Sequence, residues 1–133
     1  MIEFSEPVKT AEQAGRKVDA EKIAKSIVMV DSRGASLLAI VPAKSRVSHM
    51  KVKKLLDVRD VRLASPEEVL EHSGYPVGGV PPFNKITRVL MDLQVLNNET
   101  AIVGGGDIDK LLEVKTKDIV AVLSPTIADV SRN

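Results

Sequence analysis

Short stretches of hydrophobic residues alternate with short polar stretches along the chain. This pattern predicts strands that alternate with short helices. Residues 23–30, reading IAKSIVMV, are apolar and β-branched, which is typical of a buried strand. Residues 31–34, reading DSRG, predict a tight turn, and residues 35–41 predict the returning strand of a hairpin. Further strands are expected at 1–4, 58–63, 87–93, 100–103, 111–114 and 127–130.

Three helix-start signals lie near the two ends of the chain. Thr10 and Gln13 have the spacing of a capping box, and the short helix they begin is expected to end by Lys17. Asp19 predicts a single capped turn. Thr116 is expected to cap a helix that runs through residue 123.

The middle of the chain contains two further helix signals. Residues 65–68, reading SPEE, combine a serine cap, a proline at the first helical position and early carboxylates. Gly74 is expected to end that helix in the left-handed conformation. Ser48 predicts the cap of a basic amphipathic helix. The apolar side of this helix is expected to comprise Met50, Val52, Leu55 and Leu56, with Lys51, Lys53 and Lys54 outside.

This order of elements predicts an α+β protein, with a curled, barrel-like mixed β-sheet and helices packed outside it. At 133 residues the chain is long enough for one hydrophobic core, so we expect a single domain over residues 1–133. There is no cysteine, which excludes disulfides, thiolate catalysis and thiolate metal sites. The N-terminus lacks a signal sequence and no apolar run is long enough to span a membrane, so we expect a cytoplasmic protein.

Residues 74–83, reading GYPVGGVPPF, form an apolar loop about which the chain is organised. The segment holds three glycines, three prolines and two of the chain's three aromatic residues, so it forms neither a helix nor a central strand. Glycine allows a close approach of the backbone to a ligand, while proline stiffens the loop. Composition alone favours a proline-rich turn that covers the core, and a loop that grips a carbonyl or ribose is the alternative.

Positive charge is concentrated in one segment. Residues 44–62 carry seven basic and two acidic side chains, whereas the net charge of the whole chain is +1. Such a segment is either a cationic face toward phosphates or a solvated helix face. The seven basic residues are Lys44, Arg46, Lys51, Lys53, Lys54, Arg59 and Arg62. Aromatic residues make up only 2% of the chain, which argues against RNA binding by a platform of stacked bases.

Lys25 is a charged residue within an otherwise apolar strand. Alternation places it on one face with Ile23, Ile27 and Met29, which would normally point inward. The side chain therefore either points into a pocket or reaches solvent at the end of the strand. His49 and His72 have no spacing that suggests a metal site, and both are expected at the surface.

The chain resembles the YbaK/ProX family of aminoacyl-tRNA deacylases, which are related to the editing domain inserted in bacterial prolyl-tRNA synthetases. The resemblance rests on IAKSIV at 23–28, SGYPVGGVPPF at 73–83, MD at 91–92, VGGG at 103–106 and ADV at 128–130. It implies that Lys25 is the residue on which deacylation depends. It also implies a pocket for the terminal adenosine and its aminoacyl group, lined by Ser26, Gly78, Gly79, Val80, Pro82, Gly104, Gly105 and Gly106.

The function implied by this resemblance is trans-editing, the hydrolysis of a small amino acid from a mischarged tRNA such as tRNA-Pro, without a cofactor. Its partners would be aminoacyl-tRNA, contacted through its backbone by Lys51, Lys53 and Lys54, and an aminoacyl-tRNA synthetase. Lys25 would act as an ammonium or hold the attacking water, and the substrate's vicinal hydroxyl would accept the proton. Two alternatives remain open: a tRNA-binding or synthetase-binding module without turnover, and a sensor of free amino acids or nucleotides.

Overall fold

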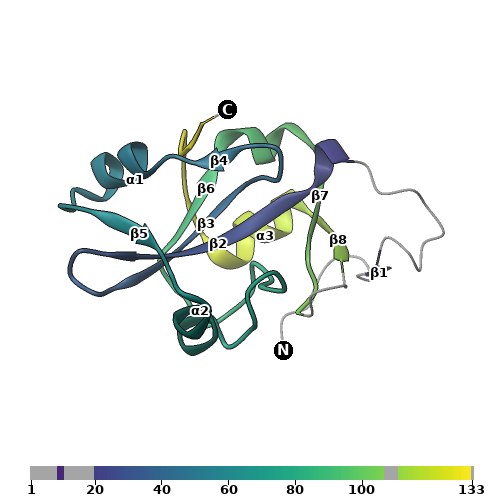
Figure 1. Ribbon diagram of the computed structural model, residues 1–133. Coiled ribbons are helices and arrows are strands. Elements are labelled where there is room, and N and C mark those ends of the chain that lie inside the picture. Colours follow the sequence, from purple (N-terminus) through teal and green to yellow (C-terminus); the bar gives the residue numbers. More distant parts are fainter. Residues whose placement is uncertain (1–8, 11–19, 107–110, 133) are drawn as a thin grey trace.

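A computed structural model describes residues 9–10, 20–106 and 111–132 (Figure 1). The strands are β1 (Lys9–Thr10), β2 (Ala24–Asp31), β3 (Ser36–Pro42), β4 (Arg46–Val47), β5 (Val61–Leu63), β6 (Val89–Asp92), β7 (Thr100–Gly104), β8 (Leu111–Lys115), β9 (Thr126–Ala128) and β10 (Ser131–Arg132). The helices are α1 (His49–Leu56), α2 (Pro66–Ser73) and α3 (Thr116–Leu123), with 3-10 turns η1 (Ala20–Lys22) and η2 (Leu93–Asn97).

The largest sheet is mixed, as expected. Its strand order is β5-β2-β3-β6-β9, with β2 antiparallel to both neighbours and β6 parallel to both of its own. A second sheet has the order β1-β8-β7, and β4 pairs with β10. The α+β class and the mixed sheet are therefore confirmed.

The barrel-like closure is not confirmed, because the large sheet ends on β5 and β9. Both are three-residue strands, which offer few hydrogen bonds to a further strand. The large sheet meets the second sheet through one isolated bridge, between Ile23 and Ile102. A single bridge does not join the two sheets into a closed barrel.

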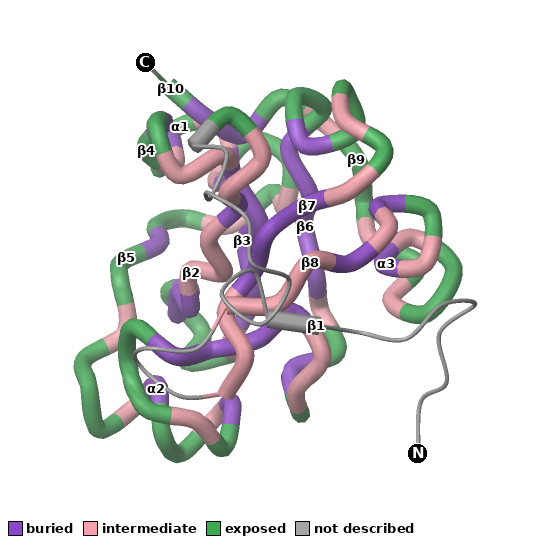
Figure 2. The backbone as a smooth tube through the Cα atoms, turned by 90° about the vertical axis from the view of Figure 1, so that its right-hand side faces the viewer, coloured by how far each residue is buried: buried purple, intermediate pink, exposed green. Residues whose placement is uncertain are grey.

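Both faces of the large sheet are covered, which explains why its central strands are apolar at consecutive positions. Buried residues gather in β3, β6 and β7, with exposed residues on the helices around them (Figure 2). One core contains Val28, Leu38 and Met91 together with residues of α2 and α3. The other contains Met29 and Leu90 together with residues of α1 and with Val130, which comes just before β10. α1 thus covers one face, while α2 and α3 cover the other.

The predicted hairpin is present, and a buried carboxyl group holds its turn. β2 and β3 pair from Ala24 opposite Pro42 to Val30 opposite Ser36. Asp31 accepts hydrogen bonds from the backbone N–H groups of Arg33 and Ala35 at 2.8 and 3.0 Å. Its second oxygen lies 2.9 Å from Nη2 of Arg88. Burial by itself would raise the pKa of Asp31, but these hydrogen bonds and the Arg88 guanidinium lower it.

The predicted helix caps are confirmed for α1 and α2. Ser65 and Glu68 form the reciprocal capping box, and Gly74 ends α2 with φ of 86°. Ser48 caps α1 by accepting a hydrogen bond from the N–H of Lys51. The predicted apolar side of α1 is wrong in part, because Met50 is 63% exposed, Leu55 is 40% exposed and only Val52 is fully buried. A helix of eight residues makes just over two turns, so few of its side chains reach the sheet.

The prediction that Thr116 caps α3 is wrong, because Thr116 is the first helical residue. Its hydroxyl donates to the carbonyl oxygens of Asn98 and Glu99, and the capping position is Lys115. The turn predicted after Asp19 is confirmed as η1. β4 and β10 were not expected, since two-residue strands carry no alternation of polarity. The strand expected at 1–4 and the helix expected at 11–17 lie outside the described residues.

Candidate active site

A pocket of about 460 Å³ opens where the two sheets diverge. β2 pairs with β3 along its length, but with β5 only over Met29 to Asp31. Beyond β5, the N–H of Ala64 donates to the Val28 carbonyl at 3.0 Å, and Ile23, just before β2, forms an isolated bridge with Ile102. The β2 edge between these contacts lines the pocket. The opposite walls comprise Leu63, Ala64, Val69, Val77, Gly78, Val80, Gly104 and Leu111.

The pocket brings together five residues that the resemblance implied, namely Lys25, Ser26, Gly78, Val80 and Gly104. The remaining four, Gly79, Pro82, Gly105 and Gly106, do not line it. The walls at Leu63, Val69 and Leu111 were missed, because they come from three elements that no local pattern relates to Lys25. A signal that could have found one of them is the apolar side of α2, on which Val69 is buried.

Residues 74–83 have no regular structure, as predicted, but hydrogen bonds hold both ends of the loop. At the start, the buried Ser73 hydroxyl donates to the Val69 carbonyl at 2.6 Å and accepts from the Tyr75 N–H. At the end, Asn84 donates to the Pro81 carbonyl and accepts from the Ile86 N–H, both at 2.8 Å. The loop is therefore a stiff wall rather than an unanchored cover.

The two glycine segments form one packed unit. The N–H of Gly106 donates to the carbonyl of Gly79 at 3.0 Å, and the N–H of Gly79 donates to Pro76. Gly104 lies against the backbone of Val80, where a Cβ atom would be 2.8 Å from the carbonyl oxygen. Glycine is therefore required at position 104 by close approach of two backbones. Gly79 and Gly106 serve in this contact rather than in the pocket.

Lys25 is half-buried and lines the pocket beside apolar side chains. No carboxylate among the described residues forms an ion pair with it. An ammonium that faces a pocket without a protein counter-ion is available to a ligand carbonyl or anion. This placement favours the pocket interpretation of Lys25 over the solvent interpretation.

Ser26 supplies the other polar side chain of the pocket lining. Its Oγ atom is buried and has no hydrogen-bond partner among the described residues. A buried hydroxyl without a partner costs free energy, so a ligand that bonded to it would gain that amount. Among the described residues, the pocket thus offers one ammonium and one hydroxyl inside apolar walls, and none of its lining residues there carries a carboxyl or imidazole group.

Several residues of the predicted cationic face are engaged within the protein. Lys44 pairs with Glu21, and Arg62 forms a two-pronged pair with Glu68 at 2.6 and 2.8 Å. Hydrogen bonds from Arg62 lower the pKa of Glu68 to about 2. Lys53 and Lys54 have no ion-pair partner in the described part of the chain. They are therefore the lysines of α1 that remain available to a phosphate.

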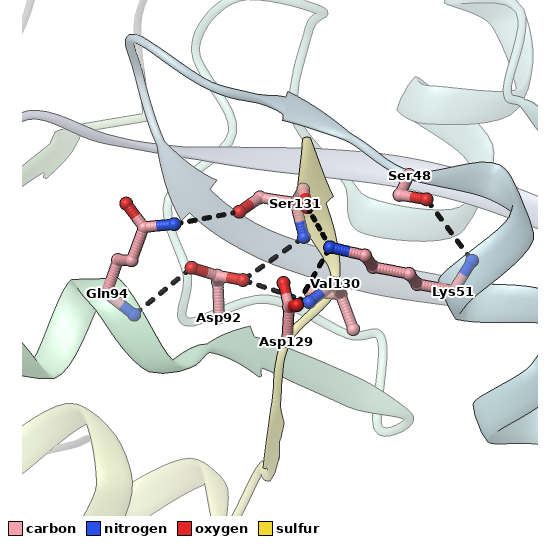
Figure 3. A network of polar contacts seen from close by, with 7 residues as sticks. All are labelled: Ser48, Lys51, Asp92, Gln94, Asp129, Val130 and Ser131. Atoms are coloured by element: carbon pink, nitrogen blue, oxygen red, sulfur yellow. Dashed lines mark hydrogen bonds and ion pairs between the residues drawn. The ribbon is translucent and has the colours of Figure 1, made fainter. Parts of the chain in front are cut away.

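Lys51 joins α1 to the end of the described chain. Its ammonium donates to Asp129 and to the Ser131 carbonyl, each at 2.8 Å (Figure 3). The hydrogen bond from Lys51 lowers the pKa of Asp129. Lys51 was expected to contact the tRNA backbone, and in the structure its ammonium is bonded to Asp129 and Ser131 at the protein surface.

Asp92 is the centre of the same network. Its side chain is almost fully buried, and one oxygen accepts from the N–H groups of Val130 and Ser131 at 2.9 and 3.1 Å (Figure 3). The other oxygen accepts from the N–H of Gln94. The motif residues at 91–92 and 128–130 thus meet, and they fix β10 rather than line the pocket.

His49 is exposed, as expected, whereas His72 is half-buried. In residues 9–10, 20–106 and 111–132, no group of three or more His, Cys, Asp or Glu side chains could hold a metal ion. No helix in these same ranges has the length and apolar character needed to cross a membrane.

Comparison with solved structures supports the fold. The hypothetical protein APE2540 is 33% identical with a TM-score of 0.79, and the match covers 92% of this chain and 81% of that chain. A protein described as a candidate trans-editing enzyme for prolyl tRNA synthetase is 29% identical with a TM-score of 0.81, covering 92% of this chain and 77% of the other.

Comparison with other proteins finds one relative of similar length and others that are several times longer. The YwhH protein of Bacillus subtilis is 26% identical over 123 residues, covering 90% of this chain and 78% of that protein. The proline–tRNA ligase of Thermotoga neapolitana is 30% identical over 104 residues, covering 77% of this chain. This chain spans only 18% of that ligase, about a fifth of its length. The family described as the aminoacyl-tRNA editing domain matches residues 5–122, and the chain therefore belongs to this family.

Proposed function

We propose that the protein is an aminoacyl-tRNA deacylase that hydrolyses a small amino acid from the 3′ end of a mischarged tRNA. The observation that carries this proposal is the ammonium of Lys25, which has no ion-pair partner among the described residues and lies in an apolar pocket walled by the two glycine segments. Membership of the editing-domain family and the likeness to a candidate trans-editing enzyme support the same activity.

The proposed reaction is the attack of water on the ester carbonyl carbon. The carbonyl oxygen becomes an oxyanion, the bond from carbon to the ribose oxygen then breaks, and that ribose oxygen leaves with a proton. The products are a free amino acid and a tRNA with its hydroxyl restored. Stabilising the oxyanion is the main demand, and Lys25 is the charged group that can meet it.

Backbone N–H groups are further donors that can stabilise the oxyanion. The N–H groups of Gly79 and Gly106 are already bonded within the protein, which leaves Gly78 as the loop glycine that lines the pocket. Ser26 offers a hydroxyl on the opposite wall. No described lining side chain is an evident general base, so we assign the proton relay to the vicinal hydroxyl of the substrate ribose, which accepts the water's proton and passes its own proton to the leaving ribose oxygen.

The pocket favours small amino acids. A volume of about 460 Å³ must hold the terminal nucleoside as well as the aminoacyl group, and Val69 and Val80 narrow it. An apolar pocket distinguishes two amino acids that differ by one methylene by only about 1–3 kcal/mol. A second selection step that removes wrong amino acids after aminoacylation is therefore useful. The kinship with proline–tRNA ligases makes tRNA-Pro the first candidate, with the synthetase as a partner and the cytoplasm as the place of action.

The test is deacylation of tRNA-Pro charged with alanine, serine, cysteine or threonine. We expect the wild-type protein to release one or more of these, and Lys25→Ala to lose at least about 100-fold in rate with unfolding free energy unchanged. Lys85→Ala is the matched control, because that lysine is exposed and does not line the pocket. Activity of Lys25→Ala within a few-fold of wild type would reject the assignment.

The two alternatives have distinct outcomes. A binding module would bind tRNA or a synthetase with no turnover on any ester. A sensor would bind free amino acids or nucleotides more tightly than an aminoacyl-adenosine analogue with a non-hydrolysable linkage. Calorimetry with these ligands separates both from a deacylase.

A further inference from the structure

A second hollow, of about 360 Å³, adjoins the candidate active site. The two share Lys25, Ile27 and Leu63, so these three side chains form the ridge between them. The rest of the second hollow includes Arg46 of β4 and Arg132 of β10. Lys25 is therefore the charged residue common to both hollows.

The lining of this second hollow is strongly cationic. Lys25, Arg46 and Arg132 carry formal positive charges, His49 adds an imidazole, and none of the described residues that line it is acidic. Arg46 and Arg132 are directly opposite each other in the β4–β10 pair. Like charges at opposed strand positions destabilise a pair, and an anion between them would remove that cost.

These two arginines differ from the basic residues nearby. Lys44, Lys51 and Arg62 each pair with a carboxylate of the protein. Within the described ranges, Arg46 and Arg132 have no such partner. In the described residues, Arg46 and Arg132 therefore carry unneutralised charge, as Lys53 and Lys54 do, but only the two arginines line this hollow.

The backbone that presents the arginines is held firmly. Asp92 bonds the N–H groups of Val130 and Ser131, immediately before Arg132 (Figure 3). The N–H of Ser48 donates to the Val130 carbonyl at 2.7 Å, which ties β10 to the start of α1 beside His49. The two guanidinium groups are thus mounted on a fixed two-stranded support.

We propose that this hollow binds a phosphodiester group of the RNA whose esterified terminal nucleoside occupies the adjacent pocket. The proposal rests on the proposed function for the identity of that nucleoside. Arginine suits the role because its planar fork donates two hydrogen bonds to a phosphate. Lys25 on the ridge then lies between the phosphate and the ester carbonyl, and Leu63 supplies apolar contact for the sugar between them.

The test compares two substrates that differ by one phosphate. Alanyl-adenosine has none, whereas the same ester on a cytidylyl-adenosine dinucleotide has one phosphodiester. We expect the wild-type protein to have a KM for the dinucleotide ester roughly tenfold or more below that for alanyl-adenosine. The variant R46Q/R132Q should lose this advantage, and its log KM for the dinucleotide ester should depend less on log salt, by about 0.7 in slope.

The control variant is R33Q/K117Q, which removes two exposed cations that line neither hollow. It should keep the dinucleotide advantage. An R46Q/R132Q variant that also keeps the advantage would overturn the proposal. Equal losses on both substrates would overturn it as well, because the arginines would then act on the ester pocket rather than on a phosphate.

A binding measurement keeps the proposal testable without turnover. The probe is a cytidylyl-cytidylyl-adenosine trinucleotide with a free 3′ end, and R46Q/R132Q should bind it roughly tenfold more weakly than wild type. If no ester is hydrolysed but this loss is seen, the proposed function fails and the phosphate site stands. Inorganic phosphate is the competitor; if it binds as tightly as the trinucleotide, the site belongs to a free anion and the proposal fails.

Discussion

A Cβ atom on Gly104 would lie 2.8 Å from the carbonyl oxygen of Val80, which is closer than such atoms approach in folded proteins. The obstacle is backbone, so it has no flexible end that could move aside. Gly104→Ala should therefore separate the two glycine segments, lowering the free energy of unfolding by about 1–3 kcal/mol and reducing deacylation. Urea unfolding and the deacylation rate measure the two effects.

The control for that substitution is Gly34→Ala. Gly34 also gains a strained side chain, because its φ is +84°, but it lies in the β2–β3 turn and has open space around its Cβ position. It should lose stability and keep its activity per folded molecule. Equal losses of activity in both variants would show that the contact between Gly104 and Val80 does not shape the pocket.

Asp92 provides a second test, because its side chain satisfies backbone donors that water cannot reach. Asp92→Ala would leave the buried N–H groups of Val130 and Ser131 without their side-chain acceptor. Each such loss costs about 1–3 kcal/mol, so we expect about 2–6 kcal/mol from the pair. Asp92→Asn keeps one carbonyl oxygen and should lose less. Denaturant midpoints would contradict this account if both variants matched wild type.

The ion pair of Asp31 with Arg88 predicts a dependence of stability on pH. The pKa of Asp31 is lower in the folded protein than in the unfolded chain, where it is near 3.8. The ionised carboxylate therefore adds to the free energy of unfolding above pH 3.8, and this contribution is lost as the pH falls through the lowered pKa of the folded protein. Arg88→Gln should therefore lower the urea midpoint at pH 7, and the gap to wild type should narrow at pH 3. Arg33→Gln, in the same turn, alters an exposed side chain and should show little effect at either pH. A gap of constant size would contradict the prediction.

We expect Lys53 and Lys54 to contribute measurably to the affinity for tRNA. Neutralising both as Gln should weaken binding and reduce the slope of log affinity against log salt by about one to two units. Lys117→Gln on α3 is a single-charge control, since Lys117 is exposed on a different helix. Lys51→Gln should behave differently and lower stability, because Lys51 bonds to Asp129 and Ser131. An unchanged slope in the double variant would make this face of α1 a solvated surface.

Local patterns in the sequence predicted the hairpin, the caps of α1 and α2, and the irregular loop at 74–83, because each depends on neighbours within a few residues. Lys25 stood out for the same reason, as a charge that broke an apolar strand. The pocket walls could not be found this way, since Leu63 and Leu111 meet Lys25 only through tertiary pairing. Arg132 is a similar case, because it reaches Arg46 through a two-residue strand that has no periodic signal.

β2 pairs with β3 over its whole length, with β5 at one end and with β7 at the other. Lys25 is opposite Val41 within that pairing, so its Cα position is set by the sheet rather than by the loop that faces it. Substitutions in residues 74–83 can therefore change which side chain fits without moving the amine. For the proposed deacylase, a few loop changes would then alter which aminoacyl group fits, while the position of the amine stayed the same.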